Sequence, residues 1–511
     1  MRHATHVVRL AALMTAAIVG VVVLALPGPG RGQAKDTLVI ALPFEIPTAD
    51  THKVTGLPAI GMNAQISDVL VLEQNGKVVP WLAESWELAD GGRSLIFKIR
   101  DNVRMHDGRT LTAEDVKFSL DRFRKFSVGR SALLIVESIT TMPGNRVRVT
   151  ARAPYAPLLR TFTYTTISVY SKAAIESMGE DQFSRRPVGP GPYTFVELIR
   201  GDRMVLEAFD QYWAGRPRFR RIIVRTIRDD QARVAALEAG DVDVIHAFSP
   251  LEAERLAKNS RLKVLNPPSA GFIRLNMNVQ RPPFNNVKVR QAMAHALNRE
   301  LIAKGIFKNL ARVAHSIVPD NAFGYTPRYD VYDYNPDRAR QLLQEAKAEN
   351  VSFILSVGAG RYLMDREVAI TVQAQLRRVG VNVQLQFMEW GQFADLIRQP
   401  LDKSQTQMTL TWWRTINGDA DSAIGIFSRA ELPPAGNNIP FYDNAEWNRL
   451  YDAQQVERDE KKRLALLHDL QRIAMRDLPV IPMYNQPQFW ATRANLSNFE
   501  PKITPLSTVH P

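Results

Sequence analysis

The sequence predicts an α/β protein of two or three lobes with substantially parallel sheets. Stretches of alternating apolar residues, typical of strands, are followed by stretches with apolar residues at helical spacing, and this alternation continues along the chain. With 511 residues, 45% of them hydrophobic, the chain can bury a large core but is too long for a single one.

The first clear pair of elements lies between residues 94 and 123. Apolar residues at positions 95, 97 and 99 share one face of a strand. Thr112 stands three residues before Asp115, which is close to a capping box, and apolar residues follow at positions 116, 120 and 123. This segment therefore predicts a strand, a turn and a helix in that order.

Later helices are predicted by their start and stop signals. One ends at Gly240, and another covers positions 368–379 and ends at Gly380, before a strand that alternates at positions 383, 385 and 387. The predicted caps of three helices are Asp229 or Asp230, Asn285 or Asn286, and Asn335 followed by Pro336.

Three breaks rich in proline or glycine divide the chain. They are RPVGPGP at residues 186–192, RPP at 281–283 and LP at 478–479. Such breaks suit crossovers between lobes, where changes in backbone conformation are concentrated.

The N-terminal segment predicts export. Arg2 and Arg9 precede an apolar run over residues 10–26, which a Pro/Gly break and the small residues Gly32 and Ala34 follow. We interpret residues 1–34 as a cleaved signal peptide that directs the protein to the periplasm. The alternative is a retained membrane anchor, because the apolar run is close to spanning length.

Composition narrows the possible partners. The formal charge is +13, but the basic residues are scattered among acidic ones, so nucleic acid is not the expected partner. The chain has no cysteine, which excludes disulfides, thiolate metal sites and a lipidated cysteine.

Motifs for catalysis or metal binding are missing from the sequence. There is no H-E-x-x-H, no G-x-S-x-G, no P-loop and no G-x-G-x-x-G, and no two of the later histidines are four residues apart. We therefore expect a binding protein without catalytic residues, metal or cofactor.

One segment resembles a ligand site. Trp412, Trp413 and Arg414 are followed closely by Asn417, Asp419 and Asp421. Tryptophan gives rigid apolar walls, arginine matches a carboxylate, and the aspartates can receive an ammonium group. The alternative is that the tryptophans lie in the core and the charges cap a turn. Arg361 and Tyr362 form a second candidate loop, for which a solvated loop is the alternative.

The chain also resembles the peptide/nickel class of solute-binding proteins of ABC importers. The landmarks, in order, are LAESW at residues 82–86, HDG at 106–108, LTAEDV at 111–116, GPGPY at 189–193, YW at 212–213, ALEAGDVD at 236–243, VRQA at 289–292 and LPVIP at 478–482. The resemblance implies a two-lobed periplasmic-binding-protein clamp with mixed, largely parallel sheets, and delivery of a peptide-like ligand to importer permease subunits by a monomer.

The resemblance also implies a domain layout. The first lobe would combine residues 35–75, 186–280 and 479–511, an inserted subdomain would cover 76–185, and the second lobe 281–478. The Trp412–Asp421 segment would line the ligand site between the lobes.

One position departs from the family pattern. Relatives that bind ordinary peptides carry an aspartate for the ligand's ammonium, and Ile416 stands at that position here. The segment looks closer to the glutathione-binding branch, with Arg414 and Arg361 as candidates for the ligand's carboxylates. An ordinary dipeptide or oligopeptide receptor, a membrane-tethered sensor or chaperone, and an exported enzyme are the alternatives.

This departure generates a prediction. If Ile416 occupies the ammonium position, Ile416→Asp improves the affinity for ordinary dipeptides relative to the native compound, because a buried ammonium gains a partner. Calorimetric titration of both proteins with the same dipeptides measures the change. An unchanged preference would show that Ile416 does not occupy that position.

Overall fold

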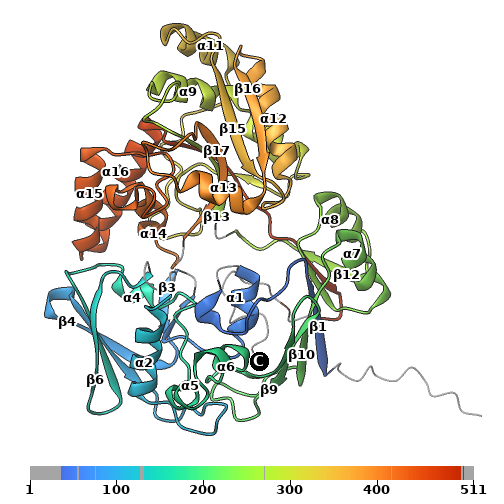
Figure 1. The fold of residues 1–511 in the computed structure, drawn as a ribbon, viewed down its shortest axis with the longest axis vertical. Helices are drawn as coiled ribbons and strands as arrows, with labels where there is room; N and C mark the ends of the chain where they lie inside the picture. Colours follow the sequence, from blue (N-terminus) through green and yellow to red (C-terminus); the bar gives the residue numbers. More distant parts are fainter. Residues whose placement is uncertain are drawn as a thin grey trace, which may run out of the picture. The chain divides into compact units, whose positions relative to one another are not determined.

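The computed structural model describes residues 36–54, 57–74, 76–126, 132–269, 271–415, 417–496 and 499 (Figure 1). The predicted signal peptide and Ile416 lie outside the described residues. Within the described part, no helix combines the length and the apolar character that crossing a membrane requires.

A seven-stranded mixed sheet is built from segments far apart in the sequence. β1 lies near its centre and runs parallel to both β10 and β11, whereas the outer pairs are antiparallel. In sheet order the strands are β12 (Leu262–Leu265), β19 (Trp490–Arg493), β11 (Val244–His246), β1 (Thr37–Leu42), β10 (Arg221–Thr226), β9 (Arg203–Ala208) and β8 (Tyr193–Ile199).

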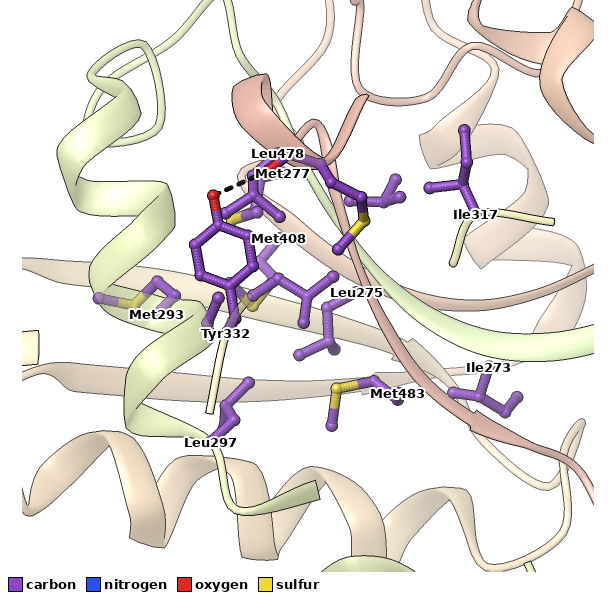
Figure 2. Close-up of a cluster of buried hydrophobic side chains, with 14 of the residues drawn as sticks. Ile273, Leu275, Met277, Met293, Leu297, Ile317, Tyr332, Met408, Leu478 and Met483 are labelled. Carbon is purple, nitrogen blue, oxygen red and sulfur yellow. Dashed lines mark hydrogen bonds between the residues drawn. The ribbon is translucent and has the colours of Figure 1, made fainter. Parts of the chain in front are cut away.

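A six-stranded mixed sheet contains the strand that leads to the candidate site. In sheet order it consists of β14 (Arg312–Val313), β18 (Val480–Asn485), β13 (Gly271–Met277), β17 (Met408–Arg414), β15 (Ser352–Gly358) and β16 (Asn382–Met388). Alternate residues of its central strands enter one large apolar core, where Ile273, Leu275 and Met277 meet Met408 and Met483 (Figure 2). The opposite face of β13 therefore carries the intervening residues, including Arg274.

A four-stranded antiparallel sheet forms a third unit with its own core. Its order is β4 (Ala83–Ala89), β5 (Ser94–Ile99), β7 (Arg146–Ala151) and β6 (Val136–Met142), and α2 (Ala113–Phe123) contacts β6 and β7. The predicted strand and helix correspond to β5 and α2. Thr112 and Asp115 form the expected capping box, in which the hydroxyl of Thr112 accepts from the backbone of Asp115.

The remaining elements connect or cover these sheets (Figure 1). A short two-stranded sheet pairs β2 (Val71–Gln74) with β3 (Lys77–Pro80). The other α-helices are α1 (Leu57–Asn63), α4 (Leu158–Thr161), α5 (Lys172–Met178), α6 (Glu180–Arg185), α7 (Asp230–Ala239), α8 (Pro250–Leu256), α9 (Val287–Ala296), α10 (Arg299–Gly305), α11 (Pro336–Glu345), α12 (Asp365–Arg377), α13 (Trp390–Ile397), α14 (Ala420–Ile424), α15 (Ala445–Val456) and α16 (Glu460–Asp477). The 3-10 helices are η1 (Thr51–Lys53), η2 (Asp90–Gly92), η3 (Gly425–Phe427) and η4 (Arg429–Glu431).

The predicted caps of three helices and the predicted end at Gly240 are confirmed at residue level. The helix predicted to end at Gly380 ends earlier, because α12 stops at Arg377 and Gly380 follows in the turn. Asp229 caps α7, Asn286 caps α9, and Asn335 caps α11, with proline in the first turn. Gly240 ends α7 in the left-handed conformation, as expected for a residue without Cβ.

The expectation of largely parallel sheets is wrong. Parallel pairing is limited to β1 with β10 and β11, and β15 with β16 and β17, within the described strands. The connection from β8 to β9 is short, and such a connection can join only antiparallel neighbours, whereas a longer segment leads from β9 to its antiparallel neighbour β10. The sheets are mixed, but antiparallel pairs predominate.

The structure also moves two expected lobe boundaries. The layout predicted from the resemblance assigns β13 and β18 to the first lobe, yet both pair within the six-stranded sheet, where β13 lies between β18 and β17. Hydrogen-bonded neighbours in one sheet belong to one folding unit. We therefore propose that the crossovers lie at residues 266–269 and 486–489, where Asn266 accepts from the backbone N–H of Gln488 at 3.1 Å.

Gly271, at the start of β13, is required by the close approach of β17. A Cβ atom at this position would stand 2.1 Å from the carbonyl oxygen of Trp413 and 2.8 Å from the ring of Trp412. Backbone atoms of a central strand can move only if hydrogen bonds between the strands are broken. Only glycine therefore fits at this position without displacing β17.

We predict that Gly271→Ala lowers the free energy of unfolding by about 1–3 kcal/mol, because overpacking forces the two strands apart. Gly305→Ala is the matched control, since a Cβ there meets no atom within 4 Å. The control is expected to leave stability unchanged or raise it by less than about 1 kcal/mol. Urea denaturation of the three proteins measures both effects, and equal stabilities would contradict the close-approach argument.

Candidate functional site

β17 brings the predicted tryptophans to opposite faces of the six-stranded sheet. Trp412 stands opposite Ile273 and Trp413 opposite Phe272 on β13, so the two indoles alternate as strand residues do. Both rings pack against the apolar core, and their Nε1 atoms have no hydrogen-bond partner among the described residues. The alternative that the tryptophans lie in the core thus holds for their rings. Their two buried N–H groups, however, have no acceptor among the described residues.

A cavity of about 920 Å³ adjoins the end of β17. Its size lies within the range of pockets that enclose small molecules, about 300–1,000 Å³. It is lined by residues of the predicted inserted subdomain and of the segment after β17, among them Ile135, Tyr155, Tyr164, Trp413, Asn417, Asp421, Ile426, Tyr451 and Gln455. Three of the predicted site residues, Trp413, Asn417 and Asp421, therefore share one cavity.

Asp421 is a buried carboxylate without an ion-pair partner in the described part of the chain. The hydroxyl of Tyr155 donates to its Oδ2 at 2.7 Å, and Nε2 of Gln454 donates to its Oδ1 at 2.5 Å. Burial raises the pKa of Asp421, and the nearby Asp419 charge raises it further. An arriving ammonium group would neutralise this carboxylate where its charge is most costly.

Asp419 differs from Asp421 although it lies two residues away. Its carboxylate accepts from both terminal nitrogens of Arg463, at 2.7 and 2.9 Å, and Nε of Arg160 lies 3.7 Å away. Asp419 also caps α14 by accepting from the backbone of Asp421 at 2.9 Å. Because two arginines already neutralise Asp419, Asp421 is the one of the two predicted aspartates that is left as a candidate to bind a ligand ammonium.

Arg414 and Asn417 lie beside the same cavity. The guanidinium of Arg414 donates to the hydroxyl of Tyr164 at 3.3 Å and lies 5.7 Å from the centre of its ring. Oδ1 of Asn417 accepts from the backbone of Asp419 at 3.2 Å, which fixes the turn before α14.

The second predicted loop is brought close to β17 but does not line this cavity. Arg361 stacks on Trp390, 4.8 Å from the ring centre. Burial raises the pKa of the Tyr362 hydroxyl, while the Trp412 backbone and the Arg361 and Arg274 cations oppose this rise. The predicted loop thus reaches β17 and β13 through Tyr362, whose hydroxyl interacts with the Trp412 backbone and with the Arg274 cation.

The sequence reasoning missed Arg274 and the tyrosines Tyr155 and Tyr451. Arg274 stands in a run of alternating residues, where a charge would ordinarily indicate a solvent-facing position. The tyrosines meet Asp421 only through the tertiary fold, since Tyr155 is 266 residues away from it. No group of metal-ligating side chains that could hold an ion is found in the described part of the chain.

Comparison with known proteins identifies the family. Residues 77–431 match the model of bacterial extracellular solute-binding proteins, family 5. The chain belongs to this family.

Known members of the family bind different solutes. The chain is 28% identical to the glutathione-binding protein GsiB of Pectobacterium atrosepticum over 437 residues, which cover 84% of each protein. It is 25% identical to the dipeptide-binding protein of Escherichia coli (strain K12), with 85% of each covered. Among solved structures it resembles MoaA of A. tumefacien R10 in complex with mannopinic acid, with a TM-score of 0.79, 26% identity, and 93% of this chain and 99% of that chain covered.

These findings confirm two predictions. The chain is a solute-binding protein of the peptide/nickel class of ABC importers, near the GsiB branch, and its fold is that of the two-lobed periplasmic binding proteins. Members of this family are extracytoplasmic binding proteins for peptides or peptide-like solutes.

The two aspartates of this family 5 protein are predicted to respond differently to neutralisation. Asp419→Asn leaves Arg463 buried without its carboxylate and lowers the free energy of unfolding by about 3–5 kcal/mol. Asp421→Asn changes it by less than about 1 kcal/mol at pH 7, because an amide can donate to Tyr155 and accept from Gln454. Guanidinium denaturation compares the two variants. Equal losses would show that Asp421 is as much a structural group as Asp419.

Proposed function

We propose that this protein captures a small zwitterionic, peptide-like solute in the periplasm and delivers it to the permease subunits of an ABC importer. Residues 1–34 act as a cleaved signal peptide, and the mature protein works as a monomer without catalytic chemistry. The observation that carries the proposal is Asp421, a buried carboxylate lacking an ion-pair partner among the described residues, in a cavity with aromatic walls.

The aromatic walls and the carboxylate complement an amine-bearing compound. Trp413, Tyr164 and Tyr451 supply flat apolar surface with polar edges, and Asp421 supplies the charge for an ammonium group. A solute that leaves a buried polar group of the cavity unpaired binds weakly. The cavity therefore selects solutes whose ammonium group lies where it can reach Asp421.

A glutathione-like compound or a substituted amino acid is the ligand we propose. Two observations support this choice: the relative GsiB is named for glutathione, and MoaA binds mannopinic acid. The resemblance places Ile416 where peptide-binding relatives carry aspartate, and an isoleucine at that position would disfavour a plain α-peptide. An ordinary dipeptide receptor remains the second candidate, favoured by the Escherichia coli relative.

A panel of three probes tests the proposal: glutathione, mannopinic acid and the dipeptide Met-Leu. A probe present at 100 times its dissociation constant stabilises the folded protein by about 2.7 kcal/mol, which scanning fluorimetry detects as a higher midpoint. We expect glutathione or mannopinic acid to raise the midpoint more than Met-Leu does, and Asp421→Asn to abolish the rise. N-acetylated glutathione is the matched control, because acetylation converts the ammonium group into an uncharged amide.

Two outcomes would contradict the proposal. No shift with any of the three probes would remove the peptide-like solute class. Chemical conversion of a bound probe after long incubation, detected by mass spectrometry, would indicate an enzyme instead.

A further inference from the structure

Arg274 is buried at the centre of the six-stranded sheet. It belongs to β13, stands opposite Thr411 on β17 and Pro482 on β18, and is 1% exposed. Ile273 and Leu275, its neighbours along the strand, enter the apolar core that Figure 2 shows. Arg274 therefore lies on the other face of the sheet, as does Trp413.

The guanidinium of Arg274 is held by two aromatic rings and one weak hydrogen bond. Its central carbon lies 5.1 Å from the ring centre of Trp413 and 5.5 Å from that of Phe427. Its Nε donates to the hydroxyl of Thr411 at 3.4 Å. Both terminal nitrogens, Nη1 and Nη2, are buried and have no hydrogen-bond partner among the described residues.

The other buried arginines of the described chain are satisfied differently. Arg122, Arg299 and Arg463 each pair with a buried aspartate. Arg233 and Arg290 donate to backbone carbonyls. Arg274 differs from all of these, since neither a carboxylate nor a carbonyl accepts from its fork.

Such an arrangement is costly for the protein by itself. Burial lowers the pKa of Arg274 to about 9, so the side chain still carries its charge at neutral pH. A buried cation whose donors lack acceptors destabilises the fold, and hydrophobic residues of similar volume would serve packing better. A planar fork fixed between two rings is, however, already oriented for two oxygen atoms of a carboxylate.

The surroundings of Arg274 connect it with the cavity. Trp413, which stacks on the guanidinium, also lines the cavity, and its Nε1 is a third buried donor without a partner among the described residues, beside Nη1 and Nη2 of Arg274. Ile426, next to Phe427, lines the same cavity. The unpaired donors of Arg274 and Trp413 therefore lie in contact. Trp413 is at the wall of the cavity, and Arg274 lies directly behind it, since Arg274 is not itself among the lining residues.

We propose that Arg274 is the residue that binds a carboxylate of the transported solute through Nη1 and Nη2. The inference rests on the proposed function and refines it: the solute carries a carboxylate for Arg274 as well as an ammonium for Asp421. Arg414 and Arg361, the arginines expected from the sequence, then have other roles, since they stack on Tyr164 and Trp390.

Ligand-free stability gives a test that does not depend on knowing the solute. Arg274→Met keeps an unbranched side chain between the two rings and removes the uncompensated charge, so its thermal midpoint stays within about 2 °C of wild type or rises. Arg299→Met is the matched control. It leaves Asp330 without its arginine and lowers the midpoint by several degrees. A fall for Arg274→Met as large as that for Arg299→Met would overturn the proposal by showing that Arg274 serves the fold.

Binding is then measured for whichever of glutathione, mannopinic acid or Met-Leu stabilises the wild type. Arg274→Met is expected to weaken that probe by about 100-fold or more, and Arg274→Lys by less, because lysine keeps the charge but loses the fork. Arg299→Met should keep the wild-type affinity. For glutathione or Met-Leu, esterifying the carboxylates should weaken wild-type binding and leave Arg274→Met unaffected.

The outcomes separate the two proposals. Wild-type affinity in Arg274→Met, or equal effects of esterification on both proteins, would overturn the role of Arg274 while leaving the proposed function intact. If no probe binds the wild type, the proposed solute class fails, and the stability comparison alone decides whether Arg274 is a structural residue.

Discussion

Asp419 and Arg463 form the ion pair on which the candidate site depends. Arg463 lies on α16, and its fork holds the carboxylate of Asp419 at the start of α14. Its Nε also contacts Oε1 of Gln454 at 3.2 Å, which orients the amide so that Nε2 donates to Asp421. One pair thus fixes the turn after β17, the start of α14 and the orientation of the carboxylate that faces the cavity.

A second arginine extends this pair towards the predicted inserted subdomain. Arg160 approaches Asp419 at 3.7 Å, and the guanidinium groups of Arg160 and Arg463 both lie over the ring of Phe323, at 5.3 and 5.4 Å. The negative face of the Phe323 ring and the carboxylate of Asp419 together stabilise the positive charges of the two arginines. Because this compensation is local, Asp421 keeps its own charge largely uncompensated two residues away, and the pKa of Asp421 is raised.

Local patterns in the sequence predicted much of the fold, whereas the site required long-range contacts. Thr112, Asp229, Asn286 and Asn335 were recognisable as caps because a cap bonds within three residues of itself. The placement of β13 beside β17 was not predictable in this way, because its partners lie more than 130 residues away. The pairing of Asp419 with Arg463 and the isolation of Arg274 follow from that placement.

The contact between Tyr155 and Asp421 links the predicted inserted subdomain to the segment that carries the candidate site. The hydroxyl of Tyr155 donates to one oxygen of the carboxylate and lowers the pKa of Asp421, but burial and the Asp419 charge outweigh this contact, so the pKa stays raised. An ammonium group would add what the hydroxyl lacks, and it would do so most strongly where the subdomain excludes water from Asp421. A ligand shifts a conformational equilibrium only by its difference in affinity for the two states. Asp421 is contacted by a hydroxyl and an amide rather than by a cation. A cationic solute therefore binds more tightly when the two segments are in contact, and its binding shifts the equilibrium towards that arrangement.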